Sequence, residues 1–303
     1  MKQLVSVERY CLIGHIVSMA FGLAGLLLVL PHPELIVSLS TPGQLMFQWG
    51  MAGGGVVYIL LGAAAVAIYA YRTLSLWHWL TFMIPAVFLS LGSELLGTST
   101  GFPFGHYGYL SGLGYKIGGL VPFTIPLSWF YLGFVCYTIA RAGLEASQMP
   151  KWVQGVGAIA LGAVLLTSWD FVLDPAMSQT AVPFWQWQQP GAFFGMPYQN
   201  FAGWMGTGAL FMSVAAFLWR NNNVVLDRSQ LGLPLAVYLS NFAFAAVMSI
   251  AGGIWIPVLL GILLGIVPAL VLWGMAQPAP EPVTAQSAAS GSLSEIPVAS
   301  AVK

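Results

Sequence analysis

Residues 152–175 read WVQGVGAIALGAVLLTSWDFVLDP. From residue 152 to residue 169 the stretch carries no charged side chain, which is about the length that crosses a hydrocarbon core of roughly 30 Å as a helix. It then meets two carboxylates, Asp170 and Asp174. An acid in hydrocarbon costs on the order of 2.5 to 3.5 kcal/mol at a helix centre, and such residues usually have a function. The stretch therefore predicts a transmembrane helix with functional acids at one end.

The composition of the whole chain agrees with a membrane protein. Of 303 residues, 58% are hydrophobic and 6% are charged, whereas a soluble domain carries roughly 25% charged residues. Nine basic and nine acidic residues cancel, so no polybasic surface indicates a nucleic-acid partner. Cys11 and Cys136 lie in apolar stretches, which favours buried thiols over a disulfide or a metal site.

Further apolar runs predict an all-α bundle of about eight transmembrane helices. We expect the first run to be a retained anchor, because it is too long for a signal peptide. Only Ala251, Gly252 and Gly253 separate the last two runs, so seven helices remain an alternative. The runs lie near residues 10–30, 46–70, 77–96, 119–141, 152–170, 201–220, 231–250 and 254–275.

The basic residues predict the orientation of this bundle. With a cytoplasmic N-terminus, every Lys and Arg except Lys116 falls on the cytoplasmic side, as the positive-inside rule requires. Both termini are then cytoplasmic. Residues 1–276 form the membrane domain, and residues 277–303, rich in Pro, Ala and Ser, are expected to be a disordered tail.

Two connections are much longer than the others, at about residues 97–118 and 171–200. The predicted topology places both on the outer side. Long loops are usually functional or disordered, and these are rich in aromatic residues, Gly and Pro. We therefore expect them to form a structured cap over the outer end of the bundle.

Glu94 lies near the outer, C-terminal end of the third predicted helix. Burial and the partial negative charge of a helix end both disfavour a carboxylate there. A neutral carboxylic acid can donate a proton, as a general acid does. The alternative is a structural carboxyl group bonded to a neighbouring helix.

Asp170 and Asp174 share one face if their helix continues that far. Pro175 disfavours helical geometry at Asp174, so we expect the helix to stop there and Asp174 to point into the loop. Two such acids near Glu94 can bind a cation, share a proton or orient water. The alternative is an Asp-Pro turn with a capping aspartate.

Polar and aromatic residues surround these acids in the sequence. Asn200 begins the sixth predicted helix, which favours a helix N-cap, although its side chain can also orient a substrate or a water molecule. Trp side chains gather at membrane interfaces whatever their function, but aromatic faces beside acids can also stabilise a cation. The aromatic residues near the acids are Trp169, Trp185, Trp187, Phe193, Phe194, Phe201 and Trp204.

No pattern for a metal or an organic cofactor is found. The four histidines are scattered along the chain, and the Gly-x-Gly-x-x-Gly and Walker patterns are missing. We therefore expect neither a metal nor a cofactor. The Gly50/Gly54 and Gly261/Gly265 pairs are typical of helix packing.

Four segments together resemble one family, the membrane carotenoid-biosynthesis proteins of the CruF and bisanhydrobacterioruberin hydratase group. The resemblance covers roughly residues 80–220. It implies addition of water across the terminal double bond of an acyclic carotenoid end group, such as that of gamma-carotene, in a bacterial plasma membrane or a thylakoid. The segments are Glu94–Tyr109, Val121–Phe130, Trp169–Pro175 and Gly191–Trp204.

This reaction fits the residues above, with Glu94 as the proton donor and Asp170 and Asp174 as water-positioning base and cation stabilisers. The roles can be exchanged among the three acids. The implied partners are a carotenoid, water, the lipid bilayer and a downstream carotenoid glycosyltransferase; the substrate would reach the site laterally between helices. The expected substrate-binding residues are Asn200, Trp169, Phe104, Tyr107, Trp187, Phe193, Phe194 and Trp204.

Two other functions remain open at this point. Acids at membrane boundaries also serve proton- or cation-coupled transporters, but no internal repeat of the kind common in transporters is seen. An end-group isomerase or cyclase would also begin by protonating an alkene. The products of the reaction distinguish these possibilities.

Overall fold

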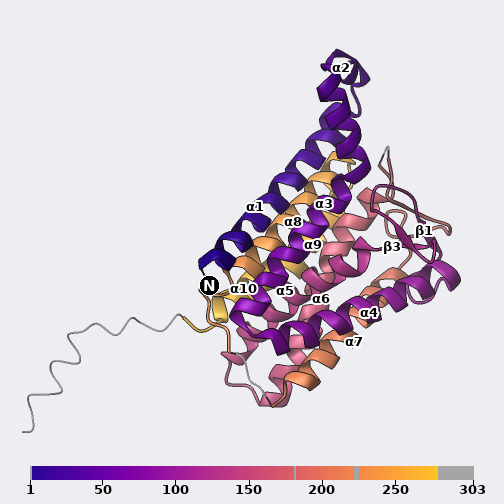
Figure 1. Cartoon of the computed structure of the whole chain (residues 1–303). Coiled ribbons are helices and arrows are strands. Elements are labelled where there is room, and N and C mark those ends of the chain that lie inside the picture. Colours follow the sequence, from indigo (N-terminus) through magenta and orange to yellow (C-terminus); the bar gives the residue numbers. More distant parts are fainter. Residues whose placement is uncertain (1, 181, 222–224, 279–303) are drawn as a thin grey trace, which may run out of the picture.

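A computed structural model describes residues 2–180, 182–221 and 225–278, and it shows a bundle of long helices with a small cap at one end (Figure 1). Short strands occur only in the cap among these residues: β1 (Tyr107–Tyr109), β2 (Lys116–Ile117), β3 (Val121–Pro122) and β4 (Trp185–Trp187). The helical elements are α1 (Lys2–Ala24), η1 (Gly25–Val29), α2 (Pro33–Ser38), α3 (Thr41–Thr73), α4 (Leu76–Thr100), α5 (Thr124–Glu145), α6 (Lys151–Met177), α7 (Gln199–Trp219), α8 (Gly232–Ala251), α9 (Trp255–Gly261), η2 (Ile262–Ile266) and α10 (Val267–Met275).

Within the described ranges, seven helical spans are long and apolar enough to cross a membrane. The π-helical turns η1 and η2 join their neighbours into continuous spans. A tight turn at Gly252 and Gly253 separates the last two spans, so the division predicted there is confirmed. The spans are Lys2–Val29, Thr41–Thr73, Leu76–Thr100, Lys151–Met177, Gln199–Trp219, Gly232–Ala251 and Trp255–Met275.

The remaining long helix, α5, lies in the centre of the bundle. It contacts α3, α4, α6, α7, α8 and α10, and almost every residue along it is buried. Because other helices surround it in place of lipid, the polar aromatic side chains of α5, such as Trp129 and Tyr131, find hydrogen-bond partners inside the bundle. With α5 included, the bundle has the eight helical passes that the apolar runs predict.

The helix α6 extends further than predicted. It continues through Asp174 and Pro175 to Met177, so the expectation that it stops at Asp174 is wrong. A proline in the last turn removes only its own N–H, whose partner would be the carbonyl of Phe171. The backbone N–H of Ser178 still donates to the Asp174 carbonyl at 3.0 Å, and tertiary contacts of the Asp174 side chain outweigh the local preference.

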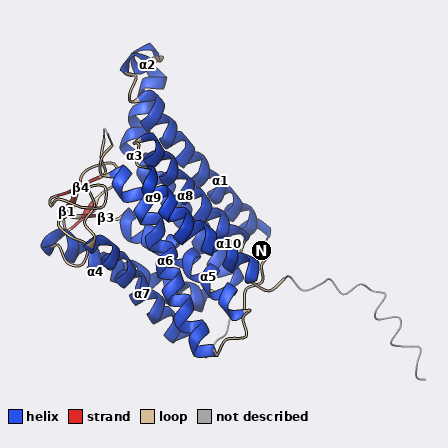
Figure 2. Ribbon diagram, turned by 180° about the vertical axis from the view of Figure 1, so that it is seen from behind, coloured by secondary structure: helices blue, strands red, loops and turns tan. Residues whose placement is uncertain are grey.

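The two long connections form a structured cap, as predicted. β1 belongs to the first connection and β4 to the second, and the two strands pair antiparallel with Tyr107 opposite Trp187. β2 and β3 form a second small sheet. Figure 2 shows β1, β3 and β4 gathered at one side of the bundle, beside α4. The β1–β4 pair therefore joins two loops that are far apart in the sequence.

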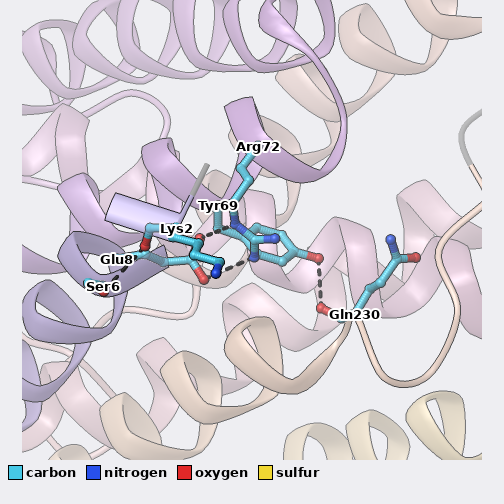
Figure 3. A network of polar contacts seen from close by, with 6 residues as sticks. All are labelled: Lys2, Ser6, Glu8, Tyr69, Arg72 and Gln230. Atoms are coloured by element: carbon cyan, nitrogen blue, oxygen red, sulfur yellow. Dashed lines mark hydrogen bonds and ion pairs between the residues drawn. The ribbon is translucent and has the colours of Figure 1, made fainter. Parts of the chain in front are cut away.

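Both ends of the described chain lie at the end of the bundle opposite the cap (Figure 1). There the Arg72 guanidinium of α3 donates to both carboxylate oxygens of Glu8 on α1, at 2.9 and 3.1 Å, and the Tyr69 hydroxyl donates to the Gln230 carbonyl at 2.9 Å (Figure 3). Lys116 lies in the cap. The predicted tail lies, apart from residues 277 and 278, outside the described residues.

Candidate active site

Glu94, Asp170 and Asp174 line one cavity between the cap-side ends of α4, α5, α6 and α7. The centre of a water-sized sphere can occupy about 60 Å³ of it. A single water needs roughly 10 to 15 Å³ on this measure, so the cavity has room for several waters or for a small branched end group. Other residues lining it include Phe104, Tyr107, Trp169, Trp187, Asn200 and Trp204.

Glu94 is buried, with 3% of its surface exposed, and it accepts three hydrogen bonds. The hydroxyls of Tyr107 and Tyr109, both on β1, donate to Oε2, the latter at 2.9 Å. The indole Nε1 of Trp129, on α5, donates to Oε1 at 2.9 Å. Three donors and no acceptor among the described residues match the needs of an ionised carboxylate.

The two tyrosines of β1 keep their protons over a wide pH range. Burial, followed by the nearby charge of Glu94, raises the pKa of Tyr107 well above its ordinary value. The same two causes, in the same order, raise the pKa of Tyr109. Both phenols therefore remain hydrogen-bond donors to Glu94 under physiological conditions.

Asp170 and Asp174 share a single amide donor. The Asn200 side-chain nitrogen lies 2.8 Å from Oδ2 of Asp170 and 3.4 Å from Oδ2 of Asp174. It also contacts the Met196 sulfur at 2.9 Å. The N-cap position of α7 is Tyr198, and it makes no side-chain capping bond, so the N-cap prediction for Asn200 is wrong. Asn200 is the second residue of α7, where its side chain can reach α6.

The cap also contacts the acid pair directly. The indole Nε1 of Trp187, on β4, donates to Oδ1 of Asp174 at 2.8 Å. Trp129 and Trp204 stack with ring centroids 4.0 Å apart and planes 21° apart, and Trp169 meets Trp204 edge-on at 5.8 Å. Aromatic faces and edges therefore form much of the wall beside the three acids.

Phe104 illustrates how closely this wall is packed. Its ring lies between α4 and α7, where a Cβ built on Gly97 would approach it to 2.7 Å and one built on Gly203 to 2.4 Å. Neither position can accept a larger residue without displacing the ring. The two glycines thus allow α4 and α7 to close on Phe104.

Most of the predicted site residues come together, but Phe193 and Phe194 do not line this cavity. They belong to an aromatic cluster with Phe171, Tyr198 and Phe201. A tight turn explains the difference: Phe193 and Met196 bond to each other across it, and Phe194 has φ of +49°. Such left-handed geometry in a non-glycine residue gives no sequence signal.

Sequence reasoning missed three aromatic residues that line the cavity, Tyr58, Tyr109 and Trp129, whereas Trp185, named among the aromatic residues near the acids, does line it. Tyr109 and Trp129 lie inside segments already noted for their resemblance. Within the described ranges, no group of three His, Cys, Asp or Glu side chains is spaced to hold a metal ion.

Comparison with known proteins assigns this chain to a family. The family model described as carotenoid biosynthesis protein matches residues 54–268. The chain belongs to this family. The matched residues include all three acids, Asn200 and both strands of the β1–β4 pair. The region that defines the family therefore contains these parts of the cavity wall. The resemblance inferred from the sequence is confirmed.

A relative supports the same family assignment. The bisanhydrobacterioruberin hydratase of Haloarcula japonica is 34% identical over 128 residues, which are 42% of this chain and 41% of that protein. The match therefore spans less than half of the relative's length. No solved structure matches the chain.

Proposed function

We propose that this protein adds water across the terminal double bond of an acyclic carotenoid end group and so forms a tertiary alcohol. The observation that carries the proposal is the placement of three buried carboxyl groups in one small aromatic-walled cavity at the end of a membrane bundle. Membership of the carotenoid biosynthesis family and similarity to a protein named as a hydratase support the choice of substrate and reaction.

The chemistry needs three things from the cavity. An acid must protonate the less substituted carbon of the (CH₃)₂C=CH unit, which leaves a tertiary carbocation. A water molecule must then attack that cationic carbon, and a base must take the proton that the attached water loses. One water is consumed, and no electron is gained or lost.

Asp170 and Asp174 are the better candidates for the proton donor. Two carboxylates that share one amide donor repel each other when both are charged, so the pair is expected to hold one proton between them. Glu94 instead accepts three hydrogen bonds and suits the ionised form. The hydrogen bonds thus favour an exchange of the roles first expected from the sequence.

Glu94 then acts as the anion that stabilises the carbocation and receives the proton of the attacking water. Its hydrogen bonds fix its position before the reaction, which is how a preorganised site lowers a barrier. Trp129 and Trp204 cover one face of each other, so the indoles of the wall add cation–π stabilisation, roughly 0.5 to 2 kcal/mol each, only through faces that stay open to the cavity. The walls also restrict the amount of water that reaches the cation.

Isotope labelling tests this proposal. Membranes containing the protein are incubated with an acyclic-ended carotenoid in heavy-oxygen water without dioxygen, and the products are analysed by mass spectrometry. We expect a product that gains one water molecule carrying the label, without added reductant. A product isomeric with the substrate would indicate an isomerase or cyclase, and label from dioxygen alone would overturn the hydratase proposal.

A further inference from the structure

A second cavity lies beside the first, between the cap-side halves of α1 and α3. Water-sized spheres can occupy about 80 Å³ of it, and no charged residue lines it. Its walls are glycines and apolar side chains such as Phe21, Met51 and Phe244. A polar ligand would lose hydrogen bonds to water that these walls cannot replace, so the cavity suits an apolar ligand.

The glycines of α1 and α3 mark where the two helices touch and where space is left between them. In the middle of the pair, a Cβ on Gly14 would lie 3.1 Å from Leu61, and one on Gly62 would lie 2.9 Å from the His15 ring. Nearer the cap, a Cβ on Gly22 or Gly54 would meet no atom within 4 Å.

The opposite end of this helix pair is fixed. Arg72 and Glu8 join α3 to α1 through two hydrogen bonds (Figure 3). The Gly50–Gly54 spacing, expected to mark helix packing, thus has two uses. Gly50 packs against the Phe21 ring, with a Cβ there at 3.0 Å from it, while Gly54 leaves space open.

The second cavity adjoins the candidate active site. Four side chains line both cavities: Tyr58, Leu113, Leu173 and Trp185. At the other end, Phe21 lines the cavity with 57% of its surface exposed on a helix that faces lipid. The second cavity therefore adjoins the acid-lined cavity across these four side chains and borders the exposed surface of α1 at Phe21.

We propose that this cavity between α1 and α3 holds the polyene chain of the substrate and admits it laterally from the bilayer. The proposal rests on the proposed function for the nature of the end group. A carotenoid is about as long as a bilayer is thick, roughly 30 Å, and the acid-lined cavity can take only its end. The adjoining apolar cavity accommodates the next part of the chain.

A pair of neighbouring glycines provides the test. Gly54→Leu places a side chain in the cavity, whereas Gly53→Leu places the same side chain on the same helix at a residue that does not line it. A Cβ meets no atom within 4 Å at either position, so both variants should fold. Gly22→Leu fills the cavity from the α1 side.

Two quantities are measured for each variant: the carotenoid that stays bound after purification, and the yield of hydrated product. We expect Gly54→Leu and Gly22→Leu to lose at least tenfold in both, and Gly53→Leu to match the unaltered protein. Equal binding and yield in Gly54→Leu and Gly53→Leu would show that the second cavity does not hold the polyene chain, while leaving the hydratase proposal intact. A different result is that the unaltered protein binds carotenoid without forming hydrated product, and Gly54→Leu does not bind it. In that case the second cavity does bind the polyene chain, and the hydratase proposal fails.

Discussion

Tyr107 and Trp187 face each other across the β1–β4 pair, and each donates a hydrogen bond to a different acid of the cavity. Tyr107 donates to Glu94 on α4 and Trp187 to Asp174 on α6. Their rings also contact each other, with centroids 5.2 Å apart. One strand pair thus fixes the positions of two acids that lie on different helices.

This relationship predicts energetic coupling between the two cap residues. Tyr107→Phe and Trp187→Phe each remove one donor and keep an aromatic ring, and each should lower turnover about tenfold to a hundredfold, because a hydrogen bond to a charged group contributes roughly 1.5 to 3 kcal/mol. The double variant should lose less than the product of the single losses. Trp152→Phe, at an exposed site on α6, is the control. A double-variant loss equal to the product of the two single losses would contradict the coupling.

The three acids should be indispensable for turnover but not for insertion. Glu94→Gln, Asp170→Asn and Asp174→Asn are each expected to lower the rate by about 10² to 10⁴, the usual range for a general acid or base. Combined losses should be strongly non-additive. Membrane levels measured by immunoblot should stay normal, and Glu34→Gln on the exposed helix α2 is the control. Near-normal turnover in all three variants would leave these acids with a structural role.

Asn200 should act through the two aspartates. Asn200→Ala removes the donor shared by Asp170 and Asp174 and is expected to lower kcat about tenfold to a hundredfold, with a smaller change in KM. The neighbouring Gln199 bonds to the backbone of Gly101 at 3.0 Å, so Gln199→Ala is the matched control. The pH dependence of kcat should shift in Asn200→Ala alone, since a merely structural role would not move it.

The two tyrosines of β1 predict a loss of stability in alkali. Burial raises the pKa of Tyr107 and Tyr109 in the folded protein, while unfolded tyrosine ionises near pH 10. Their contribution to stability is therefore full below about pH 10 and is lost as the pH rises through the folded pKa. The Tm should fall less steeply above about pH 10 when both are replaced by Phe. Tyr115→Phe, at an exposed cap position, should leave the slope unchanged.

The distribution of basic residues predicts which side of the membrane the cap faces. Reporter fusions near the two cap positions Gly112 and Gln188 should report the side opposite the cytoplasm. Fusions after four other positions should report the cytoplasm. If the cap positions scored cytoplasmic, the cavity would keep its place in the bundle but the orientation would be reversed. The four positions are Arg72, Gln148, Asn222 and Gln277.

The helices could be located from sequence because a membrane span needs about 20 apolar residues in one run. The acids at their ends could be found for the same reason, since Glu94 and Asp170 stand out against apolar neighbours. The end of α6 could not, because the local effect of Pro175 is reversed by long-range contacts to Asp174. The β1–β4 pair was equally hidden, since strands of three residues carry no periodic pattern.

The site residues show the same division. Trp169, Trp204 and Asn200 lie on helices whose register places them beside the acids. Phe193 and Phe194 lie in a loop close to Asn200 in the sequence, but the turn of this loop directs them away from the cavity. Trp129 donates to Glu94 from a helix 35 positions along the chain, a contact that depends on how α4 and α5 pack.

The central position of α5 has a consequence for how the chain is made. Among the long helices of the described chain, α5 is absent from the set apolar enough to cross a membrane by itself, and its covering helices α6, α7, α8 and α10 are synthesised after it. During translation only the earlier helices α1, α3 and α4 can shield its polar side chains from lipid. Biogenesis must therefore retain α5 at the insertion machinery, or against these earlier helices, until the later helices emerge.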